Sequence, residues 1–95
     1  MIMEIFTVFD SAAARYLEPF FAPTVEVALR RFRQTVNQPA ADNPIALYPE
    51  DYSLYHIGTY HQETGELVPF GELHSLGVAI TFVNKPRLEQ DGTDG

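Results

Sequence analysis

The sequence predicts a small α+β domain in which one antiparallel sheet of three to four strands packs against a single amphipathic helix. Three observations predict this fold. An apolar, strand-like segment begins the chain. A segment whose apolar residues recur at helical spacing follows, and a glycine-containing turn later separates two further strand-like segments. The expected order is therefore strand, helix, strand, strand, and a fourth element that is either a strand or a helix.

Residues 2–9 form the first expected strand, because apolar side chains occupy both of its alternating faces. These are Ile2, Phe6 and Val8 on one face and Met3, Ile5 and Phe9 on the other. A strand that is apolar on both faces is typical of the middle of a sheet, so we expect a central position. Residues 11–23 follow as an irregular segment, since Pro19 and Pro23 exclude a continuous helix.

The helix is expected to begin after Thr24, whose hydroxyl can accept a hydrogen bond from the first turn, and to end at Asn37 before Pro39. Glu26 lies where a negative charge is favoured by the helix dipole. One apolar stripe follows the i, i+3, i+4, i+7 rule. Its members are Val25, Ala28, Leu29, Phe32 and Val36.

Residues 38–51 form a connector rich in proline, alanine, asparagine and aspartate, and residues 52–60 form the next expected strand because of their aromatic and β-branched content. Gly65 then marks a tight turn, and residues 67–70 return as a shorter strand. Pro69 places the end of this strand at a sheet margin. The two segments together predict a β-hairpin.

Residues 75–83 fit either a strand or a helix, and their β-branched content favours the strand. The domain is thus expected to span residues 1–83. Residues 84–95 are expected to form a disordered acidic tail that carries Glu89, Asp91 and Asp94. Such a tail either keeps the protein soluble, competes with nucleic acid for a basic surface, or recruits a basic partner.

Composition excludes several classes of protein. The chain has 95 residues, no cysteine, and a formal net charge of -7, so it has no disulfides and no thiolate metal site. No apolar run approaches the roughly 20 residues that cross a bilayer, and residues 1–6 lack the features of a signal peptide. We expect a soluble intracellular protein without membrane contact.

The sequence offers no recognisable catalytic or metal centre. Its three histidines lack the spacing of a helical zinc site, and no serine lies in a Gly-x-Ser-x-Gly frame. Two pairs of carboxylates occur in expected turns, where acidic residues are common. These histidines and carboxylates are His56, His61, His74, Glu50–Asp51 and Glu63/Glu66. We expect a protein that is not an enzyme and that uses neither a cofactor nor a metal.

Half of the cationic side chains lie on the predicted helix, as Arg30, Arg31 and Arg33. Arg30 follows Glu26 by four residues, so a surface ion pair is expected between them. The remaining arginines either form a solvated polar face or contact an anionic partner, such as a phosphate backbone or an acidic protein surface.

Tyrosines are the second candidate group, because rings on a sheet can stack on the bases of a single strand. Packing in the core is the alternative role. In a regular strand over residues 52–60, Tyr52 and Tyr60 share one face and Tyr55 lies on the other. The candidate residues for nucleic-acid binding are Arg15, Arg30, Arg31, Arg33, Tyr16, Tyr52 and Tyr55.

Several short motifs occur in a characteristic order along residues 3–83. They are Val8-Phe9-Asp10-Ser11, Pro19-Phe20-Phe21-Ala22-Pro23, Ala28-Leu29-Arg30-x-Phe32, Val36-Asn37, Tyr48-Pro49-Glu50-Asp51-Tyr52-x-Leu54, Ile57-Gly58 and Thr64-Gly65-Glu66. This pattern resembles the small nonstructural protein of gokushoviruses, which are single-stranded DNA bacteriophages of the Microviridae. The resemblance singles out Phe20, Phe21, Pro23, Arg30 and Phe32; Arg31 and Arg33 lie outside it.

The resemblance implies a nonstructural phage protein that acts in the host bacterial cytoplasm during genome replication, binds DNA and is absent from the virion. Two hypotheses follow. The first is a non-catalytic protein that binds single-stranded DNA during strand synthesis or packaging. The second is a regulatory module that forms a homodimer, or docks on a phage or host replication protein, without contacting DNA. The net charge of -7 favours the second, and the local arginines and tyrosines favour the first.

Overall fold

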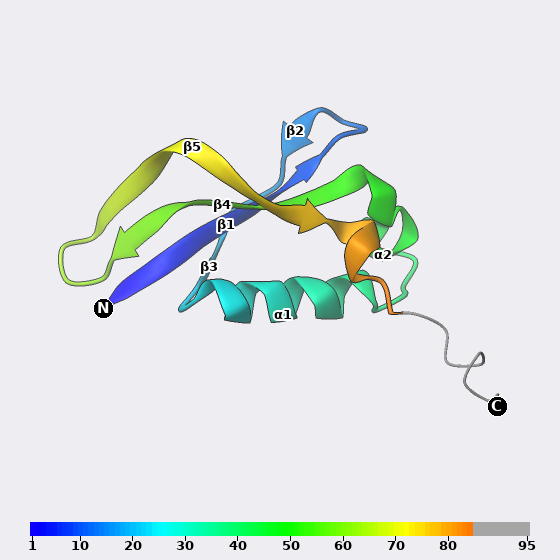
Figure 1. Ribbon diagram of the computed structural model, residues 1–95, viewed down its shortest axis with the longest axis horizontal. Helices are drawn as coiled ribbons and strands as arrows, with labels where there is room; N and C mark the ends of the chain where they lie inside the picture. Colours follow the sequence, from blue (N-terminus) through cyan, green and yellow to red (C-terminus); the bar gives the residue numbers. More distant parts are fainter. Residues whose placement is uncertain (85–95) are drawn as a thin grey trace.

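The computed structural model describes residues 1–84 and consists of one antiparallel sheet, one main helix and short helical turns (Figure 1). The strands are β1 (Ile2–Asp10), β2 (Arg15–Tyr16), β3 (Phe20–Ala22), β4 (Tyr52–His61) and β5 (Glu66–Val78). The helices are α1 (Val25–Val36) and α2 (Pro44–Leu47), with 3₁₀ turns η1 (Pro49–Asp51) and η2 (Ala79–Phe82). This architecture confirms the predicted α+β class.

Strand β1 lies inside the sheet, as its two apolar faces predict. The strand order is β2-β1-β4-β5, and β3 also pairs with β1. Strands β2 and β3 follow one another along the same outer edge of β1, β2 at residues 9–10 and β3 at residues 4–6. Because every pairing is antiparallel, the connection from β1 through α1 to β4 is not a parallel crossover.

Helix α1 packs under one face of the sheet, where Figure 1 shows it running below β1 and β4. It begins as predicted, since the Thr24 hydroxyl accepts a hydrogen bond from the Val27 amide at 3.1 Å. Its apolar stripe meets the even-numbered side chains of β1 and the start of β4. The buried cluster contains Phe6, Val8, Ala22, Ala28, Phe32, Val36, Tyr52, Leu54, Ala79 and Phe82.

The hairpin of β4 and β5 forms as predicted, and Gly65 adopts a positive φ of 76° in its turn. Strand β5 is longer than expected and is interrupted. His56 pairs with His74 and Gly58 with Pro69, so residues 70–73 oppose the single residue Ile57. The surplus residues make β5 bow away from β4 in the middle of its length, which Figure 1 shows clearly.

Three segments differ from the sequence-based expectation. Residues 11–23 are not wholly irregular, because they supply β2 and β3 to the edge of β1. The connector over residues 38–51 contains α2 and η1. Residues 75–83 divide into the end of β5 and the turn η2, which buries Ala79 and Phe82. The expected tail lies almost wholly outside the described residues, of which Asn84 is the last.

Gly58 leaves room for the backbone of β5, which lies very close to it. Replacing Gly58 therefore tests how β4 and β5 are paired. A Cβ at this position would lie 2.6 Å from the Val68 carbonyl oxygen, whereas a Cβ at Gly71 would meet nothing within 4 Å. We expect Gly58→Ala to lower the free energy of unfolding by about 1–3 kcal/mol, the usual cost of overpacking. Gly71→Ala should change it by less than about 0.5 kcal/mol. Urea denaturation measures both, and equal effects would contradict the register.

Candidate nucleic-acid interface

The face of the sheet opposite α1, called here the open face, has no described helix over it (Figure 1). The odd-numbered side chains of β1 belong to this face. Ile5 and Thr7 are nevertheless buried, because the link between β2 and β3 folds over them. The Thr7 hydroxyl donates a hydrogen bond to the Leu17 carbonyl at 2.7 Å, which holds this link in place.

Two groups of aromatic rings lie on the open face. In the first, Phe9 contacts Tyr16 with ring centroids 4.7 Å apart, and Tyr16 contacts Tyr55 at 5.8 Å. In the second, Phe21 contacts Tyr60 edge-on at 5.5 Å. Tyr16 is 47% exposed and Phe21 is 42% exposed, so both groups present ring surface to solvent.

Tyr60 lies on the open face because the bulge at Ile57 reverses the alternation of β4. Tyr60 pairs with Met3, and Tyr55 pairs with Thr7, so both belong to the open face. Tyr52 pairs with Asp10 and belongs to the helix side. A regular strand would have placed Tyr52 and Tyr60 together, and that expectation is wrong.

Tyr52 is a core residue in this structure. Its side chain is 7% exposed, and burial together with the nearby carboxylate of Asp10 raises the pKa of its phenol above 10.0. A buried ring cannot stack on a base. Of the tyrosines that the sequence proposed for stacking, Tyr16 and Tyr55 are brought together, and Tyr52 is separated from them.

Two apolar hollows lie between the aromatic groups and share Pro19, Ile57 and Pro69. The first has a volume of about 330 Å³ and the second about 320 Å³. The remaining lining residues of the first hollow are Ile5, Phe21, Gly58 and Leu67, and those of the second are Thr7, Tyr16, Leu17 and Leu73. The open face is thus a nearly uncharged strip with rings at both ends.

The arginines of α1 do not form one surface. An Nη1 atom of Arg31 donates to the Phe21 carbonyl at 3.0 Å, which places its guanidinium at the β3 edge. Arg33 faces the other flank of the helix, where its guanidinium lies 5.2 Å from the centre of the Phe82 ring and donates to the Phe82 carbonyl at 3.4 Å. Residues two apart on a helix point in nearly opposite directions, which explains the separation.

None of the four candidate arginines makes an ion pair with a described carboxylate, although Arg15 lies directly across from Asp10 in the pairing of β1 with β2. All four, Arg15, Arg30, Arg31 and Arg33, are exposed. The pair expected between Glu26 and Arg30 does not form. Arg15 lies in β2 directly before Tyr16, and Arg31 binds the backbone of Phe21. At two places along the same edge of the sheet, an arginine on the helix side therefore lies next to an exposed ring on the open face.

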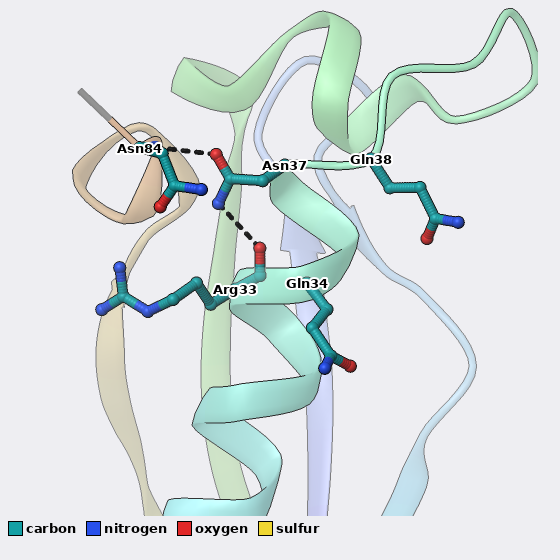
Figure 2. A pocket seen from close by; sticks show the side chains of 5 residues that line it. All are labelled: Arg33, Gln34, Asn37, Gln38 and Asn84. Atoms are coloured by element: carbon teal, nitrogen blue, oxygen red, sulfur yellow. Dashed lines mark hydrogen bonds between the residues drawn. The ribbon is translucent and has the colours of Figure 1, made fainter. Parts of the chain in front are cut away.

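A further hollow, lined by polar side chains, lies at the end of α1 (Figure 2). It has a volume of about 530 Å³ and is lined by Arg33, Gln34, Asn37, Gln38 and Asn84. Asn37 has a structural role. Its side-chain NH2 group donates a hydrogen bond to the Arg33 carbonyl at 2.8 Å, and its side-chain oxygen accepts one from the backbone N–H of Asn84 at 2.7 Å. Figure 2 shows Arg33 and the two glutamines on opposite sides of Asn37, so these groups do not converge on one ligand.

Two of the three histidines, His56 and His74, are held in structural contacts. His56 bonds the Glu4 carboxylate at 2.7 Å and stacks on Phe6 with ring centroids 4.8 Å apart. Phe70 packs edge-on against His56 and stacks on His74. Within residues 1–84, no three metal-ligating side chains gather in one place. One of the turn carboxylates, Glu63, accepts a hydrogen bond from the N-terminal ammonium group, which lowers its pKa.

Three residues of this surface, Phe9, Phe21 and Tyr60, are not among the binding residues predicted from the sequence. Phe9 and Phe21 could have been found from strand alternation, once residues 20–22 were recognised as a strand paired with β1. Tyr60 could not, because its side depends on the bulge at Ile57. No helix in the described part of the chain is long and apolar enough to cross a membrane.

Comparisons with known proteins give one match. No curated protein and no solved structure is similar to this chain at a significant level. A family model described as phage ORF5 protein matches residues 3–82, which include all of β1 except Ile2, every later strand and both α-helices. The chain therefore belongs to the phage ORF5 protein family.

Proposed function

We propose that this phage protein is a non-catalytic binder of single-stranded DNA. It acts in the host bacterial cytoplasm during strand synthesis or packaging and is absent from the virion, as its resemblance to gokushovirus nonstructural proteins implies. The observation that carries the proposal is the pairing of an arginine with an exposed ring at two places on one sheet edge. These pairs are Arg15 with Tyr16 and Arg31 with Phe21.

The spacing of the two pairs suits a single strand that runs along the edge. Tyr16 pairs with Phe9, and Phe21 pairs with Ile5, so the rings are four residues apart along β1. At a rise of about 3.3 Å per residue this separation is about 13 Å. Phosphates bind the arginines at the edge, and the bases lie on the open face against the rings.

The charge of the chain sets the strength of this binding. A net charge of -7 repels a polyanion at long range, so affinity comes from local contacts and is modest. Two phosphate contacts give a slope of about -1.4 when the logarithm of the binding constant is plotted against that of the salt concentration. A low slope with measurable affinity is the expected signature of a stacking surface with few cations.

Fluorescence anisotropy with a labelled single-stranded oligonucleotide tests the proposal. We expect micromolar binding at low salt that weakens with the shallow slope given above. A duplex of the same sequence should bind more weakly, because its bases are stacked internally and cannot reach the rings. Absence of binding at about 50 μM protein in low salt would reject the proposal.

A second candidate function is a protein-interaction module, with a homodimer as the simplest assembly. The apolar open face favours it, since Leu67 is 59% exposed and Leu73 and Phe21 are also exposed there. Pairing through the sheet edges is disfavoured, because β5 contains Pro69 and an interruption and β1 is already paired with β2 and β3. Light scattering separates the candidates: a stable dimer that binds no DNA would favour this one.

A further inference from the structure

We infer that the first hollow of the open face selects thymine among the bases of a single strand, by taking up its 5-methyl group. This inference rests on the proposed function, because it assigns a base preference to the same surface. The hollow lies beside Phe21, so a base that stacks on this ring meets the apolar wall formed by Ile57, Leu67 and Pro69.

The lining of the first hollow contains no polar side chain. Its seven residues are Ile5, Pro19, Phe21, Ile57, Gly58, Leu67 and Pro69. Among the lining residues, Ile5 pairs with Gly58 and Gly58 pairs with Pro69 in the sheet, whereas Ile57 lies at the bulge and Pro19 lies outside the strands. A base that enters the hollow therefore finds no side-chain hydrogen-bond donor or acceptor there.

An apolar wall offers no partner to the polar groups of any base, so it discriminates by the apolar contact that each base adds. The exocyclic amino groups of adenine, cytosine and guanine and the O4 carbonyl of thymine all lose water there without gaining a partner. Thymine presents a methyl group, for which apolar side chains are the usual contact. Uracil carries the same hydrogen-bonding groups as thymine and lacks the methyl group, so this pair isolates its contribution.

The test compares oligo(dT) with oligo(dU) of equal length by anisotropy at one low salt concentration. Burying one methyl group predicts about fourfold tighter binding of oligo(dT). In an Ile57→Thr variant the wall becomes polar, and the ratio should fall to about one. Ile80→Thr is the matched control, because Ile80 is exposed on η2, outside the lining of both hollows, and should keep the ratio of the unmodified protein.

Leu67→Ser provides a second variant of the same wall should Ile57→Thr fail to fold, since Leu67 is exposed. It should also abolish the difference between the two oligonucleotides. Equal binding of oligo(dT) and oligo(dU) by the unmodified protein would overturn this inference and leave the proposed function standing. Failure to bind either oligonucleotide would overturn the proposed function and this inference with it.

Discussion

Replacement of Phe6 by alanine is expected to lower the free energy of unfolding by about 3–5 kcal/mol, the usual cost of deleting a buried phenylalanine ring. Phe6 is fully buried in β1 and stacks between two rings, with centroids 5.5 Å from Phe20 and 4.8 Å from His56. Its ring therefore joins β1, β3 and β4. Because domains of this size are stable by only about 5–10 kcal/mol, the variant should be largely unfolded in moderate urea.

The matched control for this prediction is Phe21→Ala. Phe21 belongs to the same strand pairing, but its ring is 42% exposed and contacts only one aromatic partner, Tyr60. Its loss should lower the free energy of unfolding by about 1 kcal/mol. Urea denaturation followed by circular dichroism measures both variants. Similar losses would contradict the assignment of Phe6 to the core and of Phe21 to a surface.

The elements that the sequence predicted are those whose signals are local. The α1 boundaries follow from the hydroxyl of Thr24 and from a stripe of apolar residues at helical spacing. The position of the hairpin turn follows from Gly65, which needs a positive φ. These features depend on a few neighbouring residues, so no knowledge of the tertiary structure is required to recognise them.

The candidate site was only partly predictable because it depends on register. The bulge at Ile57 moves Tyr60 to the open face, and only the pairing of β4 with two neighbours reveals it. The short strands β2 and β3 have too few residues for a periodic pattern, so their place beside β1 was missed. Arg31 and Arg33 looked like one cluster in sequence, whereas the helix directs them to opposite flanks.

Because Arg31 and Arg33 lie on opposite flanks of the helix, substitutions on the two flanks should differ in their effect on DNA affinity. The double variant Arg15→Glu with Arg31→Glu should bind single-stranded DNA at least about tenfold more weakly at low salt, because two phosphate contacts are replaced by repulsion. The double variant Arg30→Glu with Arg33→Glu changes the net charge by the same amount. It should reduce affinity by about threefold or less, because Arg33 lies on the far flank over Phe82.

The comparison of the two double variants distinguishes local contact from overall charge. Equal losses would mean that long-range repulsion alone controls binding. This result would contradict the proposal that Arg15 and Arg31 contact phosphates at the sheet edge. A variant with lysine at both Arg15 and Arg31 keeps the charge and should retain most of the affinity, since lysine also neutralises phosphate. Loss of binding in that variant would instead indicate that the hydrogen bond from Arg31 to Phe21 shapes the surface, and melting curves would then show a matching loss of stability.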